Sequence, residues 1–258
     1  MDSIEKISYQ CSHITDVGCM CDLNEDSVYC SKDLWLIADG MGGHACGEVA
    51  SQLAVEEISS KFAKTGQLPA AIMSAHDKIF EVSTQNTTQS GMGTTIVALA
   101  NTDNNYQIAW VGDSRAYLWE SKRQRLSQIT EDHSLIVRLI KSKLISKEEA
   151  RTHPQRHMIT QCLGSLDVTK IQVDTLQSQW KGNQQILLCS DGLTDEVSDK
   201  DLANILKQDI SNQEKMTILV DIAKLAGGKD NISIILIDSP VLEDPSIWNK
   251  LKSFFMKD

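Results

Sequence analysis

Short apolar runs separated by polar turns make up the N-terminal part of the chain. Residues 7–31 have the pattern of a strand, a polar loop and a second strand, and a third apolar run follows at 34–38 after the polar turn 31–33. A tight turn pairs the residues that flank it. We therefore expect this hairpin to bring Glu25 and Asp26 near Asp39, which directly follows the third run.

From residue 47 on, the apolar residues recur with the period of amphipathic helices. The first helix is predicted at 47–64, and Pro69 suits the first position of a second one. Further strands are predicted at 94–100, 106–111, 115–119, 172–180, 185–189 and 232–237, and further helices at 134–141, 199–208 and 213–226. Helix pairs between runs of antiparallel-type strands favour a layered α+β fold over a βαβ pattern.

One domain, residues 1–240, is the simplest interpretation, because no repeat, low-complexity segment or flexible linker divides the chain. Residues 142–170 are mixed and polar, with a short helix around 146–151, and we interpret them as a surface insertion. Residues 241–258 form a tail whose apolar residues recur at helical spacing: Ile247, Leu251, Phe254 and Phe255. We expect this short amphipathic helix to pack on its own domain, with a partner-binding helix as the alternative.

Charge and cysteine usage narrow the class of protein. The chain has 258 residues and a formal net charge of -10. This charge argues against nucleic acid or an anionic membrane as the main partner, because both bind basic surfaces. No apolar run approaches the ~18 residues that a membrane span needs. The polar N-terminus does not have the pattern of a signal peptide, so the seven cysteines are expected to be reduced thiols in a cytoplasmic protein.

Four acidic residues occupy similar positions in the predicted secondary structure. Asp26, Asp39, Asp191 and Asp230 each lie next to a predicted strand end, beside Gly or Asn. Any one of them is explained by a solvated turn. Four such carboxylates brought together repel one another unless a cation neutralises them. Oxygen ligands without a His/Cys cluster favour Mg²⁺ or Mn²⁺ over zinc, and Gly40 leaves its carbonyl free to approach a metal.

Several longer segments carry a resemblance to a known family. They are TDVGCMCDLNEDS (15–27), LIADGMGGHACGEVAS (36–51), SGMGTT (90–95), WVGDSRAYLW (110–119), ITEDHS (129–134), HPQRHMITQCLG (153–164), LLCSDGLTDEVSD (187–199) and GGKDNISIILI (227–237). In this order they resemble the metal-dependent Ser/Thr protein phosphatases of type 2C, in their compact bacterial form. The resemblance spans most of residues 7–238.

The resemblance implies an α-β-β-α sandwich: two antiparallel sheets packed face to face, flanked by helix pairs. It also implies two Mn²⁺ or Mg²⁺ ions in a cleft at one edge of the sheets. By motif position, Asp39 bridges the two ions, the Gly40 carbonyl binds one, and Asp191 and Asp230 bind the other. Glu25 and Asp26 hold metal-bound waters, and the ligands of a third, weaker metal are Asp113, Asp191 and Asp195.

The implied activity is hydrolysis of phosphoserine and phosphothreonine in proteins. A hydroxide held between the metals attacks phosphorus in line, without a covalent phosphoenzyme. The implied partners are phosphorylated proteins and a bacterial Ser/Thr kinase pathway, and we expect a monomer. The alternative from another class is a catalytically weak regulator that binds phosphoproteins. The retained metal ligands argue against that alternative.

One position departs from the family pattern. The first motif usually reads G-x-x-R-x-x-N-E-D, and its Arg binds the substrate phosphate, but Cys21 stands at that position here. Three interpretations remain open. Another cation replaces the Arg, with Arg156, His157 or Arg115 as candidates. The enzyme is slow or tuned to one substrate. Or Cys21 is a redox site, near Cys19 and Cys46.

Two further features belong to the expected cleft. The segment 142–170 corresponds to the family's flap over the site and carries Arg151, His153, Arg156 and His157, which suit a phosphoprotein but also fit an ordinary solvated surface. His44 is a candidate proton donor to the leaving oxygen. A structural role in the turn before the first helix, or donation by a metal-bound water instead, is an equally good interpretation.

Overall fold

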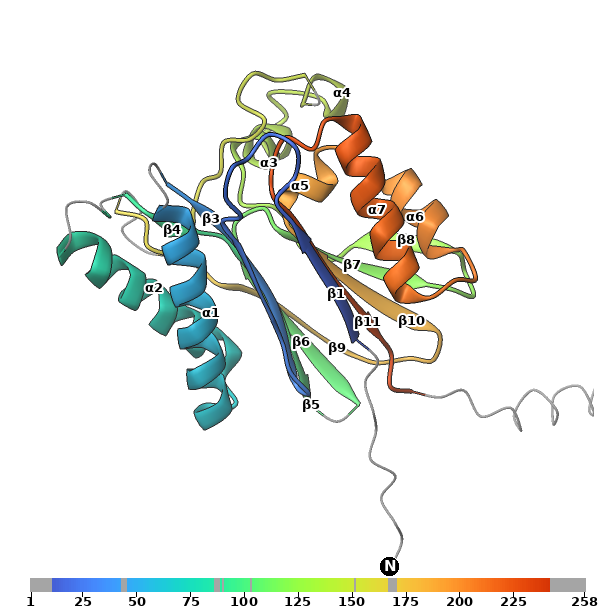
Figure 1. The fold of residues 1–258 in the computed structure, drawn as a ribbon, viewed down its shortest axis with the longest axis horizontal. Helices are drawn as coiled ribbons and strands as arrows, with labels where there is room; N and C mark the ends of the chain where they lie inside the picture. The colour runs from blue at the N-terminus through green and yellow to red at the C-terminus, as the bar shows by residue number, and fades with distance from the viewer. Residues whose placement is uncertain are drawn as a thin grey trace, which may run out of the picture.

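The computed structural model describes residues 11–42, 46–85, 89, 91–102, 104–150, 152–166 and 171–241. Two antiparallel sheets form its centre (Figure 1). The strands of the first, in spatial order, are β1 (Cys11–Asp16), β11 (Ile232–Asp238), β10 (Gln184–Cys189), β7 (Arg115–Glu120) and β8 (Arg125–Gln128). Those of the second are β2 (Asp26–Cys30), β3 (Leu34–Met41), β5 (Ile96–Thr102), β6 (Asn105–Val111) and β9 (Asp174–Gln179), and the short β4 (Gly93–Thr94) pairs with β3.

Helices cover the outer face of each sheet (Figure 1). The pair α1 (Cys46–Thr65) and α2 (Leu68–Gln85) packs on the second sheet, and the pair α6 (Asp199–Leu206) and α7 (Asn212–Ala226) packs on the first. Three short helices lie elsewhere: α3 (Leu135–Lys141), α4 (Lys147–Ala150) and α5 (Asp191–Thr194). A capping box at Ser211 and Glu214 fixes the start of α7, since each side chain accepts the backbone N–H of the other.

Strand β3 explains why the apolar run in the sequence is continuous. Leu34, Leu36 and Ala38 pack under the α1–α2 pair. Trp35 and Ile37 point the other way, into the core between the two sheets. A strand buried on both faces reads as an unbroken hydrophobic run. A third core lies under α6 and α7, so the three apolar layers confirm the predicted α-β-β-α sandwich.

The first hairpin brings Asp26 and Asp39 together, as expected. Asp26 lies directly opposite Asp39 across the β2–β3 pair. Strand β3 continues beyond its expected end, however, because Gly40 and Met41 pair with β4. Asp39 is therefore part of a strand, whereas Asp191 is the first residue of the short helix α5, which was not predicted. Strand β8 was also missed, because its polar sequence RLSQ carries no strand pattern.

The interpretation of residues 142–170 as surface is wrong at one end. Leu163 is fully buried, and its backbone exchanges hydrogen bonds of 3.1 and 2.8 Å with Thr94. The apolar residues of 142–170 are irregularly spaced, so no periodicity predicts which of them is buried. The helix expected within the tail 241–258 lies outside the described residues, of which 241 is the last. Within the described ranges, no helix is long and apolar enough to cross a bilayer.

Leu163→Ala tests whether this end of the segment belongs to the core. We expect it to lower the free energy of unfolding by about 2–5 kcal/mol, because it removes buried methyl groups and leaves a cavity. Leu166→Ala is the matched control, since Leu166 is 47% exposed. Urea denaturation followed by fluorescence measures both. Equal midpoints for the two variants would contradict a core role for Leu163.

Candidate active site

A cavity of about 480 Å³ opens at one end of the sandwich, where the loop between β1 and β2 meets α5 and the segment after α4 (Figure 1). It brings together most of the residues singled out in the sequence: Glu25, Asp39, Gly40, Asp113, Arg156, His157, Asp191, Asp195 and Asp230. Asp26 is buried beneath this set, and His44 lies outside the described residues. The far ends of the chain therefore meet in one acidic cleft.

Backbone contacts hold Asp39 at the floor of the cleft. Its carbonyl accepts hydrogen bonds from the Thr95 N–H at 2.8 Å and the Thr94 hydroxyl at 2.9 Å. Gly40 donates its N–H to the Glu25 carbonyl at 3.1 Å. A Cβ on Gly40 would collide with the Gly47 carbonyl, so only glycine allows the start of α1 to approach β3 this closely.

Asp26 and Asp191 are linked through a buried serine. Ser190 lies at the N-terminal end of α5, and its hydroxyl donates to Asp26 Oδ2 at 2.9 Å. The same hydroxyl accepts the Ser233 N–H at 2.9 Å. Ser190 thus fixes the Asp26 carboxylate from one sheet against the strands of the other. Sequence reasoning missed it, because its role depends on this contact between distant segments.

Asn231 was also missed, and it anchors the loop 17–25. Its amide nitrogen donates to the carbonyls of Val17 and Leu23, both at 3.0 Å. Its amide oxygen accepts the Glu25 N–H at 2.7 Å. Asn231 is buried. Asn231 directly precedes β11 and follows Asp230 in the chain. It therefore brings Glu25, through the loop, next to Asp230.

Asn231→Ala is expected to lower the free energy of unfolding by about 2–4 kcal/mol, because it leaves three backbone groups without their partner. Asn212→Ala serves as the control. Asn212 makes side-chain hydrogen bonds with Gln185 and Asp238 at a partly exposed position far from the cleft. We expect it to cost about 1 kcal/mol. Chemical denaturation measures both, and an equal cost would contradict the anchoring role.

Several carboxylates in the cleft are buried and lie close together, and both effects raise their pKa values. Burial first, and then the charges of Asp191 and Asp26, raise the pKa of Asp39 well above its usual value. Burial and the charge of Asp113 do the same to the pKa of Asp191. Burial raises the pKa of Asp26 to about 6 and that of Asp113 to about 7. The folded protein therefore places negative charge here at a cost that bound cations would offset.

Two atoms support a metal-binding role directly. Asp26 Oδ1 and Asp191 Oδ1 are buried and have no hydrogen-bond partner in the part of the chain that the structure describes. Buried polar atoms without partners are uncommon in native proteins. The donor set of carboxylates and the Gly40 carbonyl is oxygen-only, as Mg²⁺ and Mn²⁺ prefer. The residues present fit divalent cations.

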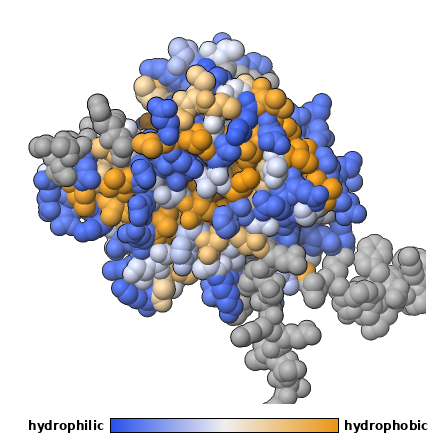
Figure 2. Space-filling view, viewed as in Figure 1, coloured by the Kyte–Doolittle hydropathy of each residue, from blue (hydrophilic) through white to orange (hydrophobic). Residues whose placement is uncertain are grey.

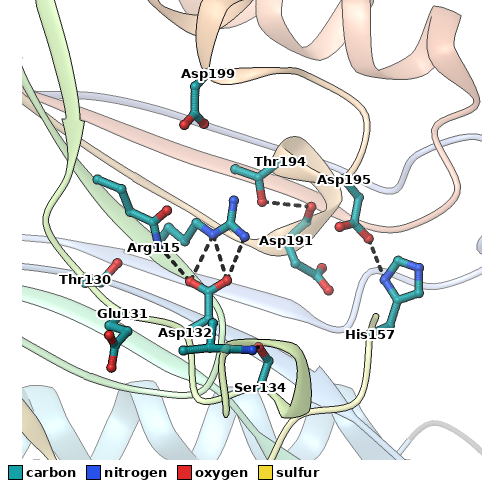
Figure 3. A network of polar contacts seen from close by, with 12 residues as sticks. Arg115, Thr130, Glu131, Asp132, Ser134, His157, Asp191, Thr194, Asp195 and Asp199 are labelled. Atoms are coloured by element: carbon teal, nitrogen blue, oxygen red, sulfur yellow. Dashed lines mark hydrogen bonds and ion pairs between the residues drawn. The ribbon is translucent and has the colours of Figure 1, made fainter. Parts of the chain in front are cut away.

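The flap contributes one nitrogen to this region. His157 Nδ1 lies 2.9 Å from Asp195 Oδ2 (Figure 3). Donor atoms of His157, Asp191 and Asp195 all lie within 4.8 Å of one another, so this trio can hold a metal ion. The resemblance implied Asp113 with the two aspartates for a third metal. Asp113 lines the same cavity, and His157 is an additional donor.

Arg115 does not have a free guanidinium to offer a phosphate. It makes hydrogen bonds of 2.6–3.1 Å to both oxygens of Asp132 (Figure 3). Its remaining nitrogen donates to the Tyr117 hydroxyl at 3.2 Å. Of the three candidate replacements for the missing Arg, only Arg156 and His157 line the acidic cavity.

Cys21 lies beside a cation that sequence reasoning overlooked. Its Sγ is 3.6 Å from the Lys229 carbonyl oxygen and 3.9 Å from Asp230 Oδ1. Lys229 lines the cavity, and its ammonium lies 3.0 Å from Glu196 Oε1 while the side chain stays 70% exposed. Burial and the charge of Asp230 raise the pKa of the Cys21 thiol, so it is a weak nucleophile at neutral pH.

The geometry agrees with comparisons to known proteins. Residues 20–221 match the family model described as protein phosphatase 2C. The chain belongs to the protein phosphatase 2C family. A curated relative, the serine/threonine phosphatase stp of Listeria welshimeri, is 36% identical over 244 residues, which cover 89% of this chain and 95% of the relative.

Solved structures of the family show the same fold. The Mycobacterium tuberculosis serine/threonine phosphatase PstP/Ppp superposes with a TM-score of 0.81 at 34% identity, covering 89% of this chain and 98% of that one. The catalytic domain of PstP in complex with 2 manganese ions gives a TM-score of 0.80 at 31% identity, covering 89% and 97%. The family resemblance inferred from the motifs is thus confirmed.

Proposed function

We propose that this member of the protein phosphatase 2C family hydrolyses phosphoserine and phosphothreonine in proteins with the help of divalent cations. The observation that carries the proposal is the convergence of Asp39, Asp191 and Asp230 in one cleft, with a buried Asp191 oxygen that lacks a partner in the described chain. In this proposal Asp39 and the Gly40 carbonyl hold one of two Mn²⁺ or Mg²⁺ ions. Asp39, Asp191 and Asp230 hold the other.

When bound, divalent cations supply a hydroxide nucleophile at neutral pH and neutralise the phosphoryl oxygens. The protein's own groups orient the reaction. Glu25 accepts the Gly47 N–H at the start of α1, which fixes its carboxylate at the cleft. Asp26 is fixed by Ser190. Both carboxylates are thereby aimed to accept hydrogen bonds from the attacking water and to hold it in line with phosphorus.

The rim supplies the positive charge that a phosphate dianion needs. Arg156, His157 and Lys229 line the cavity. Lys229 is adjacent to the position of the missing Arg, because its carbonyl contacts Cys21. We assign Lys229 and Arg156 to binding of the substrate phosphate. In this proposal a third metal binds between His157, Asp191 and Asp195.

The cellular role of the protein follows from the proposed reaction. An enzyme that removes phosphate from serine and threonine opposes a Ser/Thr kinase, and we propose that this chain does so as a monomer in the cytoplasm. Cys11, Cys19, Cys21, Cys30 and Cys189 are free thiols, which supports a reducing compartment. The face seen in Figure 2 mixes hydrophilic and hydrophobic residues, which is compatible with a monomer.

Phosphate release from matched peptides tests the proposal. One peptide sequence carrying phosphoserine, phosphothreonine or phosphotyrosine is incubated with the protein in Mn²⁺, Mg²⁺ or EDTA. We expect the first two peptides to be hydrolysed with a divalent metal and turnover to disappear in EDTA. Binding of the phosphopeptides without hydrolysis under every condition would overturn the enzyme and favour the phosphoprotein-binding regulator.

A further inference from the structure

Two cysteines far from the cleft lie in contact across the edge of the sandwich. Cys11 is the first residue of β1, and Cys30 is the last residue of β2. Their sulfur atoms are 3.8 Å apart. A disulfide has an S–S length of about 2.0 Å, so bond formation requires an approach of about 1.8 Å, which side-chain rotation can supply.

The two strands belong to different sheets. β1 is the outer strand of the five-stranded sheet, and β2 is the outer strand of the other. Their other ends lead into the loop 17–25, which Asn231 anchors. A bond between Cys11 and Cys30 would therefore link the two sheets covalently and close a ring that contains this loop.

The surroundings suit thiol chemistry. Both side chains are partly exposed, so a small reagent can reach them. The contacts with Cys30 and with the Trp35 side chain lower the pKa of the Cys11 thiol, against the opposing effects of burial and Asp238. The contact with Cys11 and burial raise the pKa of Cys30. Cys11 is thus the more easily ionised thiol, with the second thiol next to it.

We propose that Cys11 and Cys30 are a redox-active dithiol that low-molecular-weight disulfides convert into a reversible disulfide between β1 and β2. The Cys11 thiolate attacks one sulfur of the small disulfide and releases one small thiol. Cys30 then loses its proton and attacks Cys11 Sγ, which releases the second small thiol. Two protein thiols are oxidised by two electrons, and one small disulfide is reduced to two thiols.

This inference is independent of the phosphatase activity and of any bound metal. It also differs from the redox interpretation of Cys21, whose sulfur contacts Lys229 and Asp230.

Peptide mapping of the full-length protein tests the cross-link. Trypsin leaves both cysteines in the peptide 7–32, because no Lys or Arg lies between them. A protease that cleaves before Asp separates them into peptides 2–15 and 26–32, with Cys19 and Cys21 in 16–21. After oxidised glutathione and alkylation, we expect peptides 2–15 and 26–32 to be joined. Dithiothreitol should separate them again.

Thermal unfolding gives the second measurement. Closing this ring should raise the Tm of the oxidised wild type by about 5–10 °C. Cys19→Ser should keep the rise, whereas Cys11→Ser and Cys30→Ser should lose it. Glutathione attached to Cys19 without any link between peptides 2–15 and 26–32 in the wild type would overturn the proposal, and so would a link between 16–21 and either of them as the main product.

Discussion

Asp39→Asn is expected to reduce kcat/KM for a phosphoserine peptide by at least about 1000-fold. Asp39 lies at the centre of the cleft, and in the proposed site its carboxylate is shared by both cations. Metal ions stabilise the transition state of phosphoryl transfer by several kcal/mol, and each 1.4 kcal/mol corresponds to a factor of ten. An amide keeps the shape of the side chain but loses the charge that holds the cations.

The same substitution should stabilise the metal-free protein. The pKa of Asp39 is raised in the folded state, so folding at neutral pH forces an ionised carboxylate beside Asp191 and Asp26. A group with a raised folded pKa binds more protons when folded, and its contribution to stability is present at low pH and lost as pH rises through the folded pKa. For Asp26 and Asp113, with pKa values of about 6 and about 7, this loss spans roughly pH 4–7.

The difference between variant and wild type in EDTA isolates this effect. Because the pKa of Asp39 is raised, the difference in Tm between variant and wild type should be small at low pH and grow as pH rises. At pH 8 the variant should melt about 3–6 °C higher. Asp33→Asn is the control, because Asp33 is exposed in the turn of the same hairpin. A loss of activity no larger than that of Asp33→Asn would show that Asp39 does not hold the metals.

The approach of Asp26 to Asp39, which are close in sequence, was predictable from the hydrophobic pattern alone. A short polar turn between two apolar runs indicates a hairpin, and this predicted that Asp26 lies near Asp39. The alternation of Leu34 to Ala38 between two cores could not be predicted, because both faces of β3 are buried and the run is uniformly apolar. The sandwich itself came from the family resemblance rather than from periodicity.

Contacts between distant segments were outside the reach of pattern analysis. Asn231 carries no sequence signal of its own, yet it anchors the loop 17–25 through groups more than two hundred positions away. Arg115 was a reasonable phosphate ligand by residue type, but Asp132 occupies its guanidinium. Lys229 was overlooked for the converse reason: nothing in GGKDN indicates that its carbonyl contacts Cys21 or that its ammonium reaches the cleft.

Cys21→Arg is expected to raise kcat/KM on para-nitrophenyl phosphate by about 10- to 100-fold. A charge-assisted hydrogen bond to phosphate contributes about 1.5–3 kcal/mol, which corresponds to that range. Cys21 lies next to Asp230, so a longer side chain from this position reaches the cavity. The Ki of inorganic phosphate as a competitive inhibitor should fall by a similar factor, because the product presents the same oxygens.

Cys19→Arg is the matched control, since it adds the same charge two positions away. Cys19 is exposed, and its sulfur contacts the Lys224 carbonyl rather than a residue that lines the cavity. Cys21→Ser is the second control and should leave kcat/KM unchanged, because the thiol itself has no role in the proposed reaction. An equal gain from Cys19→Arg and Cys21→Arg would show a nonspecific charge effect.

Lys229→Ala decides what binds phosphate in the wild type. If Lys229 replaces the missing arginine, its removal should reduce kcat/KM by about 10-fold through KM, since an exposed cation on a rim contributes less than a buried bidentate pair. In the Cys21→Arg background the same removal should cost about 2-fold, because the guanidinium and the ammonium then share one phosphate. Lys229→Arg should retain activity in both backgrounds. Equal losses in the two backgrounds would mean that Lys229 and position 21 act on different parts of the substrate. An unchanged kcat/KM for Cys21→Arg alone would mean that the absent arginine does not limit this enzyme.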